Sequence, residues 1–287
     1  MSHEVSETVQ PFVHTTPQGR QLHGLIDLPA RAGRQPAVVV CHGFKGFMEW
    51  GFFPPLAELL AQRGFVVVRF NFSGSGMRPG EERASDLEGF RTNTFSADLE
   101  DALSILDAAA ADELAPGRID GARLGLLGHS RGGGAALLTA ASEAWRERLG
   151  ALVTWASVGT FHRYSEEQRR GWREAGEIVV VNGRTGQELP MSTAMLDDLE
   201  ENAEALDLEA AAGRRRAPWL ILHGDEDESV DPADAQRLDE AAADPYELRL
   251  VTGGSHTFGA GHPFSGPTPQ LIEVFNQTQR WLRRHLT

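Results

Sequence analysis

A serine set between glycines is the residue of this chain with the clearest chemical potential. Ser130 is the centre of Gly128-His129-Ser130-Arg131-Gly132, a G-x-S-x-G pentapeptide. An apolar run typical of a strand, 123–127, precedes it, and a run typical of a helix, 135–141, follows it. Strand, sharp turn and helix is the context in which this serine becomes a nucleophile, because the small residues leave room for a strained turn. The alternative is a glycine-rich turn whose serine only caps the helix.

A serine hydroxyl is a poor nucleophile near neutral pH and needs a base within hydrogen-bond reach. His256 is the candidate, because it lies in a glycine-rich loop directly after a strand-like run at 246–251. His262, close to a proline-rich loop, is the second choice. His42 and His223 each precede a glycine at a strand end, so we expect them to brace loops rather than carry protons.

An acid must orient the histidine and stabilise the imidazolium that forms. Asp225, Asp227 and Asp231 all follow the buried-type strand 218–224, and each is a candidate. Asp231 precedes a proline and is typical of a helix N-cap, while Asp225 could cap the turn. The chain order is therefore serine, acid, histidine.

These motifs together resemble the α/β-hydrolase superfamily, in its serine-hydrolase branch. The resemblance runs from about residue 20 to the end and is carried by His42-Gly43-Phe44, by the serine pentapeptide, by Gly224-x-x-Asp227-x-x-Val230 and by Gly254-Ser255-His256. Within the superfamily the chain is similar to small bacterial carboxylesterases, including cinnamoyl (feruloyl) esterase-like and serine-aminopeptidase-like enzymes. The resemblance implies that Asp227 is the acid of the triad.

The tetrahedral oxyanion of acyl transfer needs hydrogen-bond donors aimed at it. One donor is expected from the backbone N–H of Arg131, the residue after the nucleophile. The resemblance implies that the second is the backbone N–H of Phe44, in the loop after the strand 37–41. A serine at the elbow, where haloalkane dehalogenases and epoxide hydrolases carry an aspartate, favours ester hydrolysis through an acyl-enzyme without a cofactor.

Alternating strand and helix signals predict the elements that position these residues. Strands are expected at 22–28, 38–41, 65–70, 124–127, 149–155, 220–222 and 248–251, and helices at 56–61, 97–111 and 270–285. Several of the strands are apolar throughout, as strands covered on both faces are. The pattern predicts an α/β class protein with the α/β-hydrolase fold, a mostly parallel central sheet flanked by helices.

One stretch of about 60 residues between two predicted strands is too long for a simple crossover. It contains a helix-like run at 166–175, a hairpin signal turning at Asn182-Gly183 and a second helix-like run at 197–206. By resemblance we expect residues 159–213 to form a cap over the active site, with 1–158 and 214–287 forming the hydrolase core. A structural elaboration that does not touch substrate is the alternative.

Aromatic and histidine side chains near the predicted motifs are the candidates for a substrate pocket. His42, His129, Trp172 and Phe258 are the expected pocket residues, although Trp172 could equally form the core of the cap. Further aromatic residues could complete an apolar mouth suited to a small or aromatic acyl ester. These are Phe44, Phe47, Trp50 and Phe264.

Composition limits the possible partners. The formal net charge of −14 disfavours binding to nucleic acid or to anionic membranes. The single cysteine, Cys41, excludes an intramolecular disulfide, and no spacing predicts a metal site. Residues 1–7 lack the features of a signal peptide, and no run has the length of a membrane span, so we expect a cytoplasmic protein. A small-molecule ester is the expected partner, and a homodimer is compatible with the sequence.

Two other functions remain open at this stage. One is a peptidase or amidase of the same fold. The other is a non-catalytic member that binds a ligand without turning it over, since a fold does not determine a function.

Overall fold

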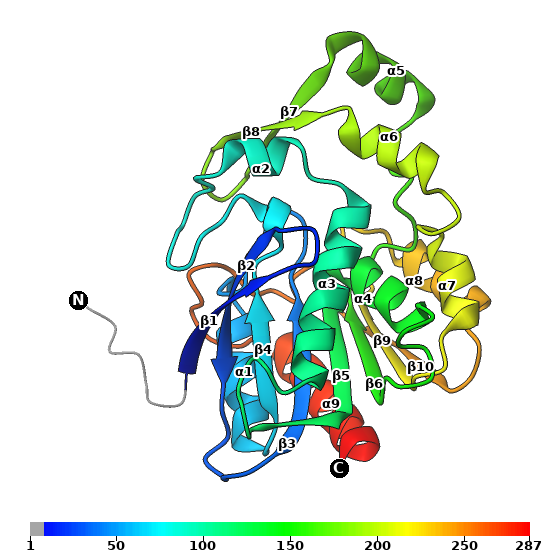
Figure 1. The fold of residues 1–287 in the computed structure, drawn as a ribbon. Coiled ribbons are helices and arrows are strands. Elements are labelled where there is room, and N and C mark those ends of the chain that lie inside the picture. The colour runs from blue at the N-terminus through cyan, green and yellow to red at the C-terminus, as the bar shows by residue number, and fades with distance from the viewer. Residues whose placement is uncertain (1–8) are drawn as a thin grey trace.

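An eight-stranded sheet runs through the computed structural model, which describes residues 9–287 (Figure 1). The prediction that residues 1–7 lack the features of a signal peptide concerns a segment outside the described residues. The strand order is β1-β2-β4-β3-β5-β6-β9-β10, and every neighbouring pair from β4 to β10 is parallel. The strands are β1 Val9–Thr15, β2 Gln21–Asp27, β3 Gln35–Cys41, β4 Val66–Phe70, β5 Ile119–His129, β6 Ala151–Trp155, β9 Trp219–Gly224 and β10 Tyr246–Val251.

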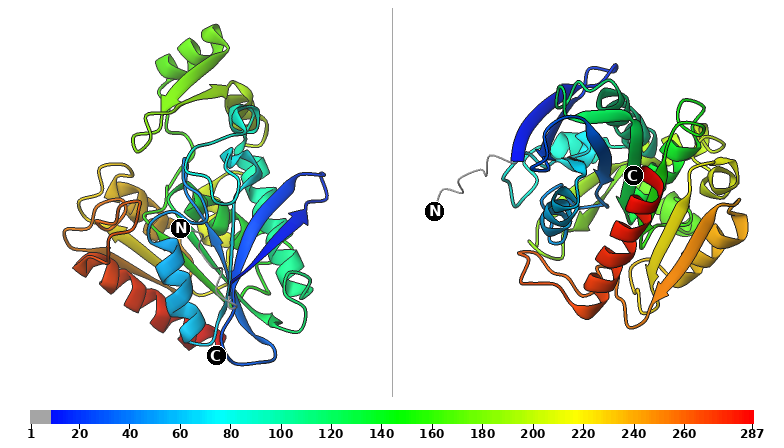
Figure 2. Two further views of the ribbon diagram at one scale, coloured as in Figure 1. Left: turned by 90° about the vertical axis from the view of Figure 1, so that its left-hand side faces the viewer. Right: turned by 90° about the horizontal axis from the view of Figure 1, so that it is seen from below.

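Helices cover both faces of this sheet. Helices α1 Phe53–Gln62 and α9 Pro269–Leu286 lie side by side on one face (Figure 2), and α3 Phe95–Ala110, α4 Arg131–Ala141 and α8 Pro232–Ala241 cover the other. The side chains of β3 show why the sheet needs a layer of helices on each face. Val38 and Val40 belong to one buried cluster and Val39 to the other, since successive strand residues point to opposite faces.

A long insertion extends beyond one end of the sheet (Figure 1). It contains α5 Glu166–Ala175, the antiparallel pair β7 Glu177–Val181 and β8 Glu188–Ser192, α6 Ala194–Glu201 and α7 Leu208–Arg214. The short helix α2 Leu87–Arg91 packs against β8, and a 3₁₀ turn, η1 Ser73–Ser75, precedes it in the core. The last of these insertion helices, α7, packs on α4 and α8 beside the sheet, whereas the hairpin stands away from it.

The predicted α/β arrangement is confirmed, with differences at its edges. Strand β1 was not predicted, because its residues are half-buried or exposed throughout and produce no apolar run. The hairpin exists, but its strands are joined through 182–187 rather than through a two-residue turn. The helix expected at 197–206 begins and ends earlier, as α6. No helix among residues 9–287 is long and apolar enough to cross a membrane.

Candidate active site

The carboxyl end of β5 delivers Ser130 into a sharp turn before α4. Ser130 has φ 57° and ψ −124°, a conformation that non-glycine residues rarely adopt. Its N–H donates to the Trp155 carbonyl of the next strand at 2.9 Å, which holds the turn against the sheet. A Cβ on Gly128 would meet the Gly132 backbone, and one on Gly132 would meet the His42 carbonyl. The two glycines of the pentapeptide are therefore required by close backbone contacts.

His256 lies between Ser130 and Asp227. The Ser130 hydroxyl donates to His256 Nε2 at 3.0 Å, and His256 Nδ1–H donates to Asp227 Oδ2 at 2.8 Å. The second carboxylate oxygen, Oδ1, accepts the N–H groups of Ser229 at 2.8 Å and Val230 at 2.9 Å. The loop after β9 thus fixes the carboxylate, the carboxylate fixes the ring, and Nε2 is left free to accept the serine proton.

The electrostatics of Asp227 suit this arrangement. Burial alone would raise the pKa of its carboxyl group. Hydrogen bonds from His223, His256 and the Val230 N–H outweigh burial and hold the pKa well below its usual range. Asp227 is therefore ionised at every pH at which His256 could act, and it stabilises a positive charge on the imidazole.

The other two aspartates have different partners. Asp225 Oδ1 accepts the Gly253 N–H at 2.7 Å and closes the turn after β10. Asp231 caps α8 by accepting the Ala233 N–H at 2.9 Å. His262, the second choice for the base, accepts the Gly51 N–H and contacts Glu82, at a distance from the serine. Of these candidates, the structure brings only Asp227 and His256 to Ser130.

His42 holds the loop that approaches Ser130. Its Nδ1–H donates to the Gly43 carbonyl at 2.9 Å and its Nε2 accepts the Phe72 N–H at 3.2 Å. A Cβ on Gly43 would lie 2.9 Å from Ser130 Cβ, so the loop passes directly beside the serine. The N–H of Phe44, in this loop, and the N–H of Arg131, at the start of α4, have no hydrogen-bond partner among residues 9–287. Two donors thus remain available next to Ser130.

The side chain of Arg131 makes a contact that the sequence did not reveal. Its Nε donates to Asp98 Oδ2 at 2.6 Å, its guanidinium lies 4.2 Å from the centre of the Phe95 ring, and both charged side chains are buried. Asp98 also accepts from Asn93 at 3.1 Å. This ion pair ties the start of α4 to α3, and no motif marks Asp98, which is one of four acidic residues in its helix.

A cavity of about 430 Å³ opens above Ser130 and His256. Its apolar wall comes partly from the core and partly from the insertion: Phe44, Phe95, Val158, Phe161, Tyr164, Met191, Met195 and Val230. Its cationic lining residues are Lys45, Arg131 and Arg163, and Ser229 completes it. Except for Phe44, sequence reasoning did not find these wall residues, because they come from segments far apart in the chain and share no motif.

The expectation that His42, His129, Trp172 and Phe258 line the pocket is not met. His129 donates to the His256 carbonyl at 2.9 Å, and His42 lies behind the loop of Gly43 and Phe44, where it donates to the Gly43 carbonyl. Trp172 is buried in the insertion, where it donates to the Met191 carbonyl at 3.0 Å and packs on Tyr164. Phe258 is fully buried against Trp155. These residues support the wall instead of forming it.

The proposed aromatic mouth also differs from the structure. Phe44 lines the cavity, whereas Phe47 is buried beside His262 and Trp50 packs on Phe52. Phe264 lines a separate cavity of about 910 Å³ near α1. The aromatic residues that do face the site, such as Phe95 and Phe161, are stacked on each other with ring centres 4.2 Å apart.

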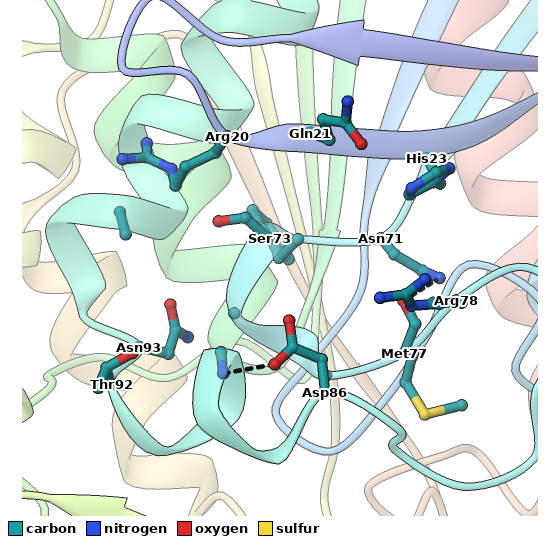
Figure 3. A pocket seen from close by; sticks show the side chains of 15 residues that line it. Arg20, Gln21, His23, Asn71, Ser73, Met77, Arg78, Asp86, Thr92 and Asn93 are labelled. Atoms are coloured by element: carbon teal, nitrogen blue, oxygen red, sulfur yellow. Dashed lines mark hydrogen bonds between the residues drawn. The ribbon is translucent and has the colours of Figure 1, made fainter.

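A third, polar cavity of about 390 Å³ lies between β2, η1 and α2 (Figure 3), and Ser130 is not among its lining residues. Two of its charged side chains are already engaged, since Arg20 pairs with Glu100 and Asp86 caps the Gly89 N–H. Among residues 9–287 no group of three or more His, Cys, Asp or Glu side chains is arranged to hold a metal ion.

Comparison with known proteins identifies the class. The model of the alpha/beta hydrolase family matches residues 38–268, so the chain belongs to this family. The esterase domain of a Rhodothermus marinus protein superposes with a TM-score of 0.65 at 19% identity, covering 97% of this chain and 99% of that one. Est1E from Butyrivibrio proteoclasticus, in a structure with bound ferulic acid, gives 0.69 at 19% identity, covering 96% and 98%. These likenesses confirm the predicted fold.

One curated relative matches over a shorter stretch. It is an uncharacterized 31.7 kDa protein from the traX-finO intergenic region of Escherichia coli, 31% identical over 110 residues. The match covers 38% of this chain and about a third, 34%, of the relative's length.

Proposed function

We propose that this protein is a serine hydrolase that cleaves carboxylic esters through an acyl-enzyme on Ser130. The observation that carries the proposal is His256, which bridges Ser130 Oγ at 3.0 Å and Asp227 Oδ2 at 2.8 Å in a single continuous chain of hydrogen bonds. This is the geometry in which one imidazole can take a proton from the nucleophile while a carboxylate holds its tautomer.

The reaction would proceed in two halves. Ser130 Oγ attacks the ester carbonyl while its proton passes to His256 Nε2, and the free N–H groups of Phe44 and Arg131 receive the oxyanion. His256 then protonates the leaving alcohol, which gives the acyl-enzyme. In the second half His256 takes a proton from water, the hydroxide attacks the acyl carbonyl, and Ser130 leaves with the proton from His256.

The cavity supports an ester with a moderately apolar or aromatic part. Aromatic side chains at Phe44, Phe95 and Phe161 offer flat apolar faces, and Met191 and Met195 offer flexible ones that adapt to different shapes. We assign residues 159–213 the role of a cap, because Phe161 and both methionines come from this insertion and complete the wall. The ester-bond chemistry is thus attributed to the core loops and the choice of substrate largely to the cap.

The test is turnover of a panel of 4-nitrophenyl and methyl hydroxycinnamate esters, together with labelling by a fluorophosphonate probe. Wild type is expected to hydrolyse esters and to carry the label on Ser130 alone, and Ser130→Ala is expected to lose both. Ser142→Ala, at the far end of α4 from the triad, is the matched control and should keep both. Turnover of aminoacyl nitroanilides in preference to esters would indicate a peptidase. An unlabelled Ser130 with no turnover would overturn the proposal.

A further inference from the structure

The active-site cavity contains the only lysine of this chain. The 287 residues include 27 lysine and arginine residues, and a single lysine, Lys45, leaves 26 arginines. Lys45 directly follows Phe44 in the loop beside the nucleophile and lines the cavity above Ser130. Its φ of 60° is a left-handed conformation that favours glycine or asparagine. Lysine is therefore unexpected at this position, because the chain uses arginine for every other cationic side chain of this kind and because the left-handed backbone favours glycine or asparagine.

The ammonium group of Lys45 lacks an acidic partner. Nζ donates to the Val181 carbonyl of the hairpin at 3.1 Å and lies 5.6 Å from the centre of the Phe44 ring. No Asp or Glu oxygen within residues 9–287 lies at ion-pair distance from it. Burial lowers the pKa of this amine, as expected for a cation that loses water and gains no carboxylate.

The other two cations of the cavity are already neutralised. Arg131 pairs with Asp98 at 2.6 Å and Arg163 with Asp234 at 2.7 Å. Among the described residues that line the cavity there is no Asp or Glu, although the chain has a net charge of −14. Asp227 lies beneath the lining, and both of its oxygens are engaged by the triad and its loop.

We propose that the site takes esters that carry a second, anionic group, a carboxylate that pairs with Lys45 while the ester carbonyl lies at Ser130. This inference rests on the proposed function and names its substrate class. A carboxylate would supply the charge-assisted hydrogen bond that the ammonium lacks, in a partly desolvated setting where such bonds are strong. The remaining apolar wall would hold the hydrocarbon between the two groups.

The carboxylate could belong to the acyl part or to the alcohol part, so the kinetic test has two arms. The first compares monoethyl esters of succinate, glutarate and adipate with the ethyl esters of the matching terminal amides. The second compares acetyl esters of glycolate and lactate with those of glycolamide and lactamide. Each pair differs in charge at nearly constant shape, and the released acid is measured by chromatography after subtraction of the uncatalysed rate.

In at least one arm, wild type is expected to favour the carboxylate over the amide by about tenfold in kcat/KM, the scale of one charge-assisted hydrogen bond. Lys45→Met keeps the length of the side chain and should bring this ratio close to one, whereas Lys45→Arg should retain most of it. Arg170→Met removes an equal charge from the exposed face of α5 and is the matched control. A lysine that only tethers the hairpin would lower both rates equally and leave the ratio unchanged, which would overturn the proposal.

A second measurement does not depend on turnover. Reductive methylation with ¹³C-formaldehyde labels the amines and keeps their charge, so the lysine region of the spectrum contains one signal, and the N-terminal amine is an internal control. Adipate should shift the Lys45 signal and leave the N-terminal signal in place, and adipamide should shift neither. No shift with adipate would refute the anion site even if neutral esters are hydrolysed. A shift in a protein that hydrolyses no ester would refute the proposed function and keep the anion site.

Discussion

Two buried histidines near the active site should make this protein sensitive to mild acid. His42 is enclosed beside the loop of Gly43 and Phe44, and His129 is enclosed next to His256. Burial lowers the pKa of His42 to about 4 and, together with the charge of His256, lowers that of His129 to about 3. In the unfolded chain both have a pKa of about 6.5. Below that pH the unfolded state binds two protons that the folded state does not.

The size of the effect follows from proton linkage. Each such proton lowers the free energy of unfolding by about 1.4 kcal/mol per pH unit, from the unfolded pKa down to the folded one. Between pH 6.5, where the unfolded histidines are half protonated, and pH 5 the two histidines should therefore cost about 3 kcal/mol, a large part of the stability of a typical domain. Asp227 does not contribute here. Its folded pKa is depressed, so the stability that it provides is present above about pH 4 and is lost only on further acidification.

Urea denaturation at closely spaced pH values tests this reasoning. His129→Gln, which keeps a donor toward the His256 carbonyl, should reduce the slope of unfolding free energy against pH by about 1.4 kcal/mol per unit between pH 6 and pH 5. His162→Gln is the matched control, because the exposed His162 is hydrated in the folded and unfolded chain alike. An unchanged slope in His129→Gln would refute the assignment of a neutral, buried imidazole, whatever the variant does to stability at pH 7.

Further substitutions test the supports of the site. Asp98→Ala leaves the buried guanidinium of Arg131 without its partner and should cost about 3–5 kcal/mol in urea denaturation; a loss below about 1 kcal/mol would show that water reaches this pair. Gly132→Ala places a methyl group against the His42 carbonyl and should abolish fluorophosphonate labelling; full labelling would mean that the elbow is looser than described. Gly171→Ala, in open space within α5, should raise stability by about 0.5–1 kcal/mol in the same urea assay, and a loss would argue against helix at that position.

The sharp turn around Ser130 was predictable because local backbone geometry demands a particular sequence. The glycines around Ser130 are required by contacts within a few residues and with one adjacent loop, so the motif and the structure carry the same information. The choice of Asp227 over Asp225 depended on a resemblance. From the residues alone all three aspartates have a local use, and the structure separates them only by which one reaches His256.

The cavity above Ser130 could not be predicted, because it is formed by residues from distant segments and not by a local pattern. Phe95, Phe161 and Met195 come from three segments and meet only after the sheet has placed them. Trp172 illustrates the converse difficulty. It is the one buried residue of a highly charged helix, which is consistent with a substrate contact or with a small local core. Its contact with Tyr164 shows that it forms a small local core.

The contacts that hold the hairpin suggest where salt should act on catalysis. The loop after β7 is joined to a core loop by one exposed ion pair, Arg184 with Glu82 at 2.6 Å. Two part-buried hydrogen bonds between the Gln187 amide and the Ala84 backbone complete the attachment. Exposed ion pairs weaken as salt screens them. Since β8 carries Met191 into the cavity wall, loosening this attachment should weaken substrate binding while the triad stays in place. We therefore expect KM for a neutral ester to rise with ionic strength while kcat holds. Arg184→Gln should raise KM at low salt and remove most of the salt dependence, and a salt effect on kcat alone would place the sensitivity in the core instead.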